Sequence, residues 1–216
     1  SIFLQSYDFE LNKLILKTQS FNWRLKRISD FVLGLLILLI SLPVILIAAI
    51  FIKIEDNGPI FYSQLRTGLY GKKIRIIKIR SMRINAEENG PKWAQKDDPR
   101  ITKVGYLLRK TRIDELPQLL SVIMGDMSLI GPRPERPEMD TKLIKKIPYY
   151  CYRNLLKPGL SGWAQVNYKY GSSEKDAERK LSYELFYLKN QSLMLDILIL
   201  IKTIKLILNL EGSDQK

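Results

Sequence analysis

Two adjacent acids, Asp114 and Glu115, lie in the most charged stretch of the chain, between Arg109 and Arg133. A carboxylate close to cations stays ionised, can share a Mg²⁺ ion with substrate phosphates, and can attack phosphorus to form an acyl phosphate. Arginines are suited to hold phosphate oxygens through paired hydrogen bonds. The pattern favours phosphoryl transfer, with Asp114 as nucleophile and metal ligand.

The same acids have a purely structural interpretation. Asp114 could cap a helix, with Pro117 in the first turn, where the missing N–H does no harm. An isolated Asp-Glu-Leu-Pro segment is more often structural than catalytic, and the two interpretations are compatible.

Composition narrows the chemistry. The 216 residues include no His and one Cys, which excludes Ser–His–Asp catalysis and Cys/His zinc sites. The net charge of +13 indicates anionic partners, whether nucleic acid, lipid headgroups or phosphorylated substrates. The length and the hydrophobic fraction of 46% predict one compact core.

An apolar run, Phe31–Ile52, contains no charged residue and would form a helix of about 33 Å, enough to span a bilayer once. Pro43, which follows Ser41 closely, predicts a break near its middle. Basic residues flank the run on both sides, and positive charge favours the cytoplasmic face. We therefore expect residues 21–54 to be a re-entrant, monotopic helix-break-helix anchor rather than a single transmembrane helix.

The remaining pattern predicts an α+β fold that is mainly helical. Segments 59–62 and 73–80 read as a small β-hairpin, and 85–100 reads as a loop. Apolar spacing predicts helices at 101–110, 115–124, 173–190 and 194–210. The last of these suits either an amphipathic helix in the membrane interface or a core helix. We expect a catalytic domain over 55–210 and a tail at 211–216. The N-terminal segment at 1–20 is compatible with either a short surface helix or the end of an upstream region.

Several motifs in order make the sequence recognisable. From about Phe21 to Leu210 it resembles the bacterial sugar transferase family, the monotopic polyprenyl-phosphate phosphoglycosyl transferases. The matching segments are Arg24–Arg27 with Asp30, the Pro43 segment, Gln64–Gly68, Lys78–Met82, Asp98–Thr102, Leu108–Thr111, Asp114–Leu119, Gly125–Ser128, Gly131–Pro134 and Lys157–Asn167. The Gly131–Glu138 run and Trp163 resemble the catalytic halves of larger exopolysaccharide-type members.

The resemblance implies transfer of a sugar-1-phosphate from a nucleotide-diphosphate sugar, in this family commonly a UDP-hexose, to polyprenyl phosphate. It implies a covalent intermediate on Asp114, with Glu115 completing the dyad and Mg²⁺ bridging the diphosphate, as a first membrane step of glycan assembly. Arg109 and Arg133 match the phosphate-binding arginines, and Lys78 and Arg80 line up with basic segments near the site. Arg112 is a departure, since a smaller or neutral residue is expected there.

Two other functions are compatible with parts of the sequence: a membrane-tethered basic module that binds nucleic acid or acidic polysaccharide, and a hydrolase of nucleotide sugars. A broken apolar segment followed by an acidic dyad argues against both, because it brings phosphate chemistry to the headgroup level. We therefore expect a nucleotide-sugar donor, a polyprenyl phosphate acceptor and membrane lipids as partners, and no nucleic acid. The oligomeric state is left open, a homodimer included.

Overall fold

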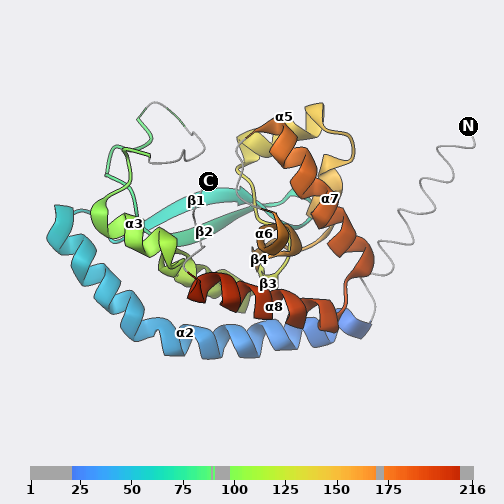
Figure 1. Ribbon diagram of the computed structural model, residues 1–216, viewed down its shortest axis with the longest axis horizontal. Coiled ribbons are helices and arrows are strands. Elements are labelled where there is room, and N and C mark those ends of the chain that lie inside the picture. The colour runs from blue at the N-terminus through green and yellow to red at the C-terminus, as the bar shows by residue number, and fades with distance from the viewer. Residues whose placement is uncertain (1–20, 89, 91–97, 169–172, 210–216) are drawn as a thin grey trace, which may run out of the picture.

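A helix of 36 residues, α2 (Phe21–Asp56), runs along one side of the protein (Figure 1). The computed structural model describes residues 21–88, 90, 98–168 and 173–209. The segments 1–20 and 211–216, for which the sequence predicted an N-terminal segment and a tail, lie outside the described residues. The predicted anchor, 21–54, falls within α2.

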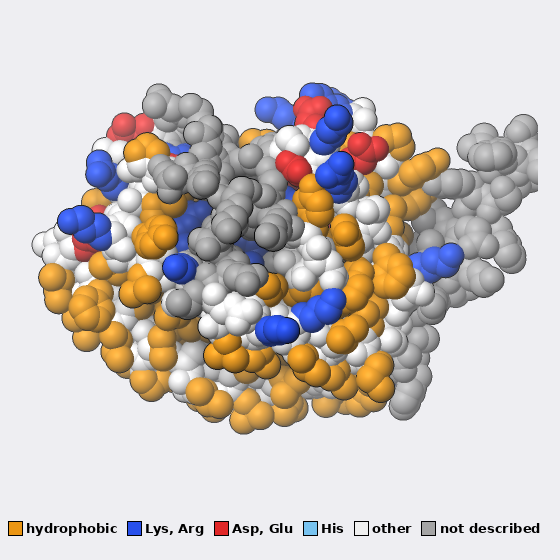
Figure 2. Space-filling view, viewed as in Figure 1, with side chains coloured by type: hydrophobic (Ala, Val, Ile, Leu, Met, Phe, Trp, Pro, Cys, Tyr) orange, Lys and Arg blue, Asp and Glu red, His pale blue; other side chains and the backbone are white. Residues whose placement is uncertain are grey.

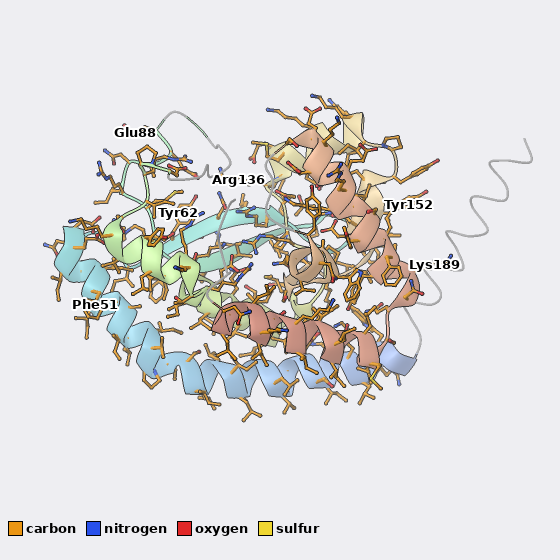
Figure 3. All side chains as sticks on the ribbon, viewed as in Figure 1. Phe51, Tyr62, Glu88, Arg136, Tyr152 and Lys189 are labelled. Carbon is orange, nitrogen blue, oxygen red and sulfur yellow. The ribbon has the colours of Figure 1, made fainter. Side chains whose placement is uncertain are left out.

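One narrow stripe of α2 packs against the protein. Its members recur at alternating intervals of four and three residues, so they share one face of the helix. They are Gly34, Leu38, Ser41, Ile45, Ala48 and Ile52. The other faces expose large apolar side chains, with Ile40 at 78% and Ile54 at 75%. Phe51 is labelled in Figure 3 and is more than half exposed.

The helix continues through Pro43, and the ribbon of α2 bends along its length (Figure 1). Proline has no N–H to donate to the carbonyl one turn earlier, and its ring pushes that carbonyl away, which bends a helix without necessarily ending it. The hydroxyl of Ser41 donates to the carbonyl of Leu38 at 2.9 Å, a second feature that bends helices. The predicted break was therefore wrong: a bend within one helix takes its place. The re-entrant path stays a prediction.

Both ends of α2 are fastened to the rest of the chain. Near its N-terminus, Arg27 donates to the carbonyls of Val122 and Ile123 at 2.7 and 2.6 Å. Near its C-terminus, Glu55 accepts from the backbone N–H of Lys103 and Val104, at the start of the next helix. The long apolar helix thus lies against one folded unit over its whole length.

The predicted β-hairpin is confirmed. Strands β1 (Phe61–Thr67) and β2 (Lys73–Ile79) pair antiparallel, and a short turn of 3₁₀ helix, η1 (Leu69–Gly71), joins them. Gly71 has a φ of +76°, which glycine adopts without strain. Alternation along β2 turns Ile74 and Ile76 into the core.

A chain of short helices follows. The expected helix at 101–110 is α3 (Lys103–Lys110), and its N-terminus is capped by the hydroxyl of Thr102, which accepts from the N–H of Gly105 at 2.9 Å. The segment expected as one helix at 115–124 is divided into a 3₁₀ helix, η2 (Ile113–Gln118), and α4 (Leu119–Met124). These elements pack on α2 and β2, and Leu119 and Val122 are fully buried.

Two short parallel strands, β3 (Ser128–Ile130) and β4 (Gly159–Ser161), were not predicted. Helix α5 (Pro137–Lys146) and the 3₁₀ helix η3 (Tyr150–Leu155) connect them. The backbones approach so closely that a Cβ on Gly159 would lie 2.0 Å from the backbone nitrogen of Gly131. Glycine at both positions is what permits this pairing.

The helices expected at 173–190 and 194–210 are α7 (Glu174–Asn190) and α8 (Leu193–Leu208). A short helix before them, α6 (Trp163–Asn167), was not predicted. A reciprocal cap between Ser173 and Asp176 starts α7. Helix α8 lies beside α2 (Figure 1), and a buried ion pair of 2.7 Å joins Lys26 to Asp196 there.

Helix α8 contributes to the core through Ile199, which is fully buried, while Ile197, Ile201 and Ile204 are more than half exposed. Hydrophobic side chains accordingly gather along the lower edge in Figure 2, where Figure 1 places α2 and α8. The position of α8 in the membrane interface stays a prediction.

Candidate active site

Glu115 lies at the centre of three cations that come from separate parts of the chain. Its Oε1 accepts from Lys78 Nζ at 2.7 Å and from Arg133 Nη2 at 2.6 Å. Arg112 Nη1 lies 3.6 Å from Oε2. Lys78 comes from β2, Arg112 from the residue before η2, and Arg133 from the turn after β3. The carboxylate thus joins the hairpin, η2 and the turn after β3 at one point.

Asp114 is adjacent to this cluster but is held differently. Within the described part of the chain, its carboxylate makes no hydrogen bond or ion pair with another side chain, and the residue is 7% exposed. Successive residues of a 3₁₀ helix point about 120° apart, which separates the two carboxylates although they are neighbours in sequence. Among the described residues, the neighbouring cations bind the oxygens of Glu115 and not those of Asp114.

The two acids differ in their affinity for protons. Burial, and then the negative charge of Glu115, raise the pKa of Asp114 to about 6, against the opposing effect of Lys78, Arg109 and Arg133. Glu115 is equally buried, but the charges of Arg133, Lys78 and Arg112 hold its pKa well below its usual range. Such a separation between neighbouring carboxyls is typical of sites that use them in different roles.

The capping role considered for Asp114 is wrong. Arg112 occupies the N-cap position of η2, and no side chain caps the helix. Arg112 has a φ of +56°, the left-handed region that is unfavourable for a residue with a Cβ. Arg112, the residue at which the sequence departs from the expected family pattern, therefore has a strained backbone and contacts Glu115.

Arg109 lies in the last turn of α3, five residues before Asp114, and its charge lowers the pKa of Asp114. Lys78 and Arg133 also act on Asp114 in this way. Three of the predicted phosphate-binding residues are thus brought to the acids: Arg109, Arg133 and Lys78.

Arg80 is held elsewhere. Its guanidinium forms a two-pronged ion pair with Asp56 at the end of α2, and its Nε donates to the carbonyl of Pro59 at 2.6 Å. These contacts use the guanidinium to fasten the end of α2 to the hairpin, and phosphate binding by Arg80 stays a prediction. Ser41 and Pro43, predicted to form the break in the anchor, lie in the bent middle of α2.

Some residues near the site were not singled out in the sequence. Arg153 and Glu184 form a buried ion pair with bonds of 2.6 and 2.7 Å, and Arg153 also donates to the carbonyl of Arg133. Tyr62 and Arg136, labelled in Figure 3, both contact Glu87, which ties the hairpin to the segment after Arg133. No local motif marks Arg153 or Glu184; an unusually charged residue within an apolar helical stripe is the available signal.

The described residues contain no group of three or more acidic or thiol side chains that would form an all-protein metal site. Asp114 nevertheless fits the way in which Mg²⁺ is often bound, through one or two carboxylates together with substrate phosphates and water. Glu115 does not fit this role, because its oxygens already accept from Lys78 and Arg133. Asp114 is thus the residue that could hold Mg²⁺, in company with a bound diphosphate.

Comparison with known proteins identifies the family of the chain. The model of the family described as "Bacterial sugar transferase" matches residues 21–210. The chain is 44% identical over 189 residues to a UDP-N-acetylgalactosamine-undecaprenyl-phosphate N-acetylgalactosaminephosphotransferase of Aeromonas hydrophila, covering 88% of this chain and 45% of that protein. It is 38% identical over 185 residues to the UDP-glucose:undecaprenyl-phosphate glucose-1-phosphate transferase of Escherichia coli, covering 85% and 40% respectively.

The chain therefore spans less than half the length of these two relatives. A relative of more similar size is the uncharacterized sugar transferase EpsL of Bacillus subtilis, which is 36% identical over 195 residues, 88% of this chain and 91% of that protein. The matched region includes the acidic dyad, its cations and all of the apolar helix. This chain belongs to the bacterial sugar transferase family.

Proposed function

We propose that the protein transfers a sugar-1-phosphate from a nucleotide-diphosphate sugar, of the UDP-hexose type, to a polyprenyl phosphate at the membrane. The observation that carries the proposal is the adjacency of two unlike acids: Asp114, which is buried and has no ion pair with any residue that the structure describes, and Glu115, which is ion-paired with Lys78 and Arg133. The names of the two relatives from Aeromonas hydrophila and Escherichia coli indicate the donor and acceptor classes.

The first step is attack by an Asp114 carboxylate oxygen on the sugar-bearing phosphorus. A phosphorus–oxygen bond forms to Asp114, and the bond to the nucleoside monophosphate breaks, which leaves a phospho-sugar on the enzyme and releases the nucleotide with the bridging oxygen. In the second step, an oxygen of the polyprenyl phosphate attacks the same phosphorus. The Asp114 carboxylate leaves, and a polyprenyl-diphosphate-sugar is formed.

The cations around Glu115 suit both steps. The side chains of Lys78 and Arg133 are 19% and 28% exposed, more than the 8% of Glu115, so part of each remains open to an incoming phosphate. Cations that are already fixed by Glu115 need little reorganisation as charge moves between phosphate oxygens. Mg²⁺, when bound beside Asp114, supplies further neutralisation of the diphosphate charge.

We propose that α2 stays on one side of the bilayer, with its outer face in a single leaflet, and that the site faces the cytoplasm. What supports this is that both ends of α2 are fastened to the same folded unit, through Arg27 and Glu55, and that its exposed faces are apolar throughout the middle. The helical segment Trp23–Asp56 is long and apolar enough to cross a membrane, but the stripe that packs on the protein makes one face of it unavailable to lipid. The phosphate chemistry would then take place at headgroup depth.

The test uses the purified protein in lipid nanodiscs with Mg²⁺, undecaprenyl phosphate and each of UDP-glucose, UDP-galactose and UDP-N-acetylgalactosamine. Release of uridine monophosphate is expected to depend on the acceptor at steady state. Release that continues equally without the acceptor would identify a hydrolase, and no release with any donor would contradict the proposal.

A second measurement tests the intermediate. A donor with ³²P in the phosphate next to the sugar should label the wild-type protein when the acceptor is omitted. Asp114→Asn should remove the label and reduce nucleotide release by at least about a thousandfold, since covalent catalysis is lost. Asp126→Asn, at an exposed acid outside the site, is the matched control and should behave as wild type. Full turnover by Asp114→Asn would refute the nucleophile.

A further inference from the structure

The turn that carries Arg133 is held by an unusual set of bonds. Four successive carbonyls, those of residues 132 to 135, each accept a hydrogen bond, and the donors come from three separate parts of the chain. The donors are Gly159 N at 2.8 Å, Arg153 Nη2 at 2.6 Å, Arg66 Nη1 at 3.2 Å and Thr67 N at 2.8 Å, in the order of the carbonyls. The backbone on both sides of Arg133 is therefore fixed before any substrate binds.

Arg153 is the more deeply buried of the two arginines among these donors. Its side chain is 4% exposed, and Nε and Nη2 bind the two oxygens of Glu184 at 2.6 and 2.7 Å. The same Nη2 also donates to the carbonyl of Arg133. On the far side, Asp140 Oδ1 lies 3.9 Å from Nη1.

A pair buried to this degree needs a reason to persist, because removing two charges from water costs as much as their attraction returns. Apolar side chains of similar size would commonly stabilise the fold as well or better. The planar guanidinium of arginine can make contacts that an apolar residue cannot. Its bonds to Glu184 fix its orientation, and in this orientation it donates to the backbone carbonyl of Arg133. A displacement of about 1 Å in a phosphate-binding group can cost about a hundredfold in rate.

We propose that Arg153, oriented by Glu184, is a positioning residue for Arg133: it fixes the carbonyl of Arg133 so that the guanidinium meets both Glu115 and the donor phosphate. Arg153 itself does not touch substrate. This inference rests on the proposed function, because it assigns Arg133 to donor binding. It predicts that the loss of Arg153 lowers kcat/KM for the donor, because Arg133 is displaced, in addition to any loss of stability.

The test is a double-mutant cycle. Arg153→Met/Glu184→Met removes both charges of the pair together, so neither partner of the pair is left as an unpaired charge. The buried Asp140, 3.9 Å from Arg153, loses its arginine in this variant but keeps the hydrogen bond from Asn154 at 3.2 Å, so the unfolding temperature of the variant is measured alongside its kinetics. We expect kcat/KM for the nucleotide sugar to fall by about ten- to a hundredfold. We also expect Arg133→Ala to reduce this kcat/KM by a factor at least about fivefold smaller in this background than in wild type, because a misplaced Arg133 already contributes less to donor binding. KM for polyprenyl phosphate should change less than KM for the donor.

The matched control replaces another buried pair, Lys26→Met/Asp196→Met, which joins α2 to α8 away from the turn. It should shift the unfolding temperature comparably while the cost of Arg133→Ala stays as in wild type. If the Arg153 pair variant does not fold, Arg153→Lys replaces it: one ammonium keeps the charge opposite Glu184 but lacks the fork that also reaches the carbonyl of Arg133.

The outcomes separate the two ideas. No nucleotide release by wild type refutes the proposed function whatever Arg153 does. An active wild type that is matched by the folded Arg153 variants in donor kcat/KM, or an unchanged cost of Arg133→Ala, overturns the positioning role.

Discussion

At the scale of single residues, the site is organised by the difference between two neighbouring acids. Glu115 gathers Lys78, Arg133 and Arg112 and keeps its own charge, while Asp114 is left with a raised pKa. Among the described residues no cation forms an ion pair with Asp114, so its oxygens stay available for the attack on phosphorus that we propose. The functional division between the acids therefore follows from which of them the cations contact.

This division predicts a pH dependence. The pKa of Asp114 is raised, and the carboxylate is the reactive form, so the activity is present above this pKa and is lost as pH falls through about 6. The dependence of kcat/KM for the donor on pH, which reports the free enzyme, should show this acid limb. Glu115→Gln removes a negative charge that raises the pKa of Asp114, so the acid limb of this variant should lie at lower pH than that of wild type. A limb that moves to higher pH would contradict this electrostatic account.

Phosphate binding by the cations around Glu115 can be tested separately. Lys78→Met should raise the KM for the donor by about tenfold or more, because a charge-assisted hydrogen bond is worth about 1.5–3 kcal/mol. Lys73→Met, at the exposed start of the same strand, is the control and should leave the KM unchanged. Steady-state kinetics with saturating acceptor measures both, and equal KM values for the two variants would exclude Lys78 from the donor site.

At the scale of elements, the helix α2 presents two different surfaces: a narrow stripe that packs on the protein, and exposed apolar faces. Its packed stripe includes the small residues Gly34, Ser41 and Ala48, seven positions apart, and these let other elements approach the helix closely. The bend at Pro43 lets one helix follow the curved surface that η2, α4 and β2 present. The remaining faces need no protein partner if lipid covers them.

Filling the packed stripe should destabilise the fold. A Cβ on Gly34 would lie 3.3 Å from Val122, so Gly34→Leu forces α2 away from α4. Overpacking of this kind costs about 1–3 kcal/mol, which should appear as a lower unfolding temperature in detergent. Leu36→Ala, at a half-exposed position of the same helix, is the control. An unfolding temperature that is unchanged by Gly34→Leu would show that the contact between α2 and α4 is not retained in solution.

At the scale of the whole molecule, the exposed apolar faces of α2 and α8 lie along one edge, and the hairpin and α7 lie away from it (Figures 1 and 2). The acidic dyad lies on η2, which packs directly on α2. A protein that rests on the bilayer with this edge holds Asp114 near the depth at which lipid phosphates lie.

This arrangement predicts that both ends of α2 are accessible from the same side of the membrane. In a Cys151→Ser background, Arg24→Cys and Asn57→Cys place single thiols at exposed positions near the two ends. A membrane-impermeant maleimide should label both in inside-out vesicles and neither in intact cells. Labelling of the two thiols from opposite sides would show that α2 crosses the bilayer and would exclude the proposed topology.

The sequence by itself determined the identity of the family, the acidic dyad, the hairpin and most helices, because these depend on local spacing and on residues that are adjacent in the chain. Tertiary structure decided the rest. Whether Pro43 breaks or bends the helix depends on what packs against it, and what the guanidinium of Arg80 contacts depends on Asp56, which reaches it from another element. The parallel pairing of β3 with β4 and the bond from Arg153 to Arg133 join residues about 20 to 30 positions apart, where no periodicity in the sequence records the contact.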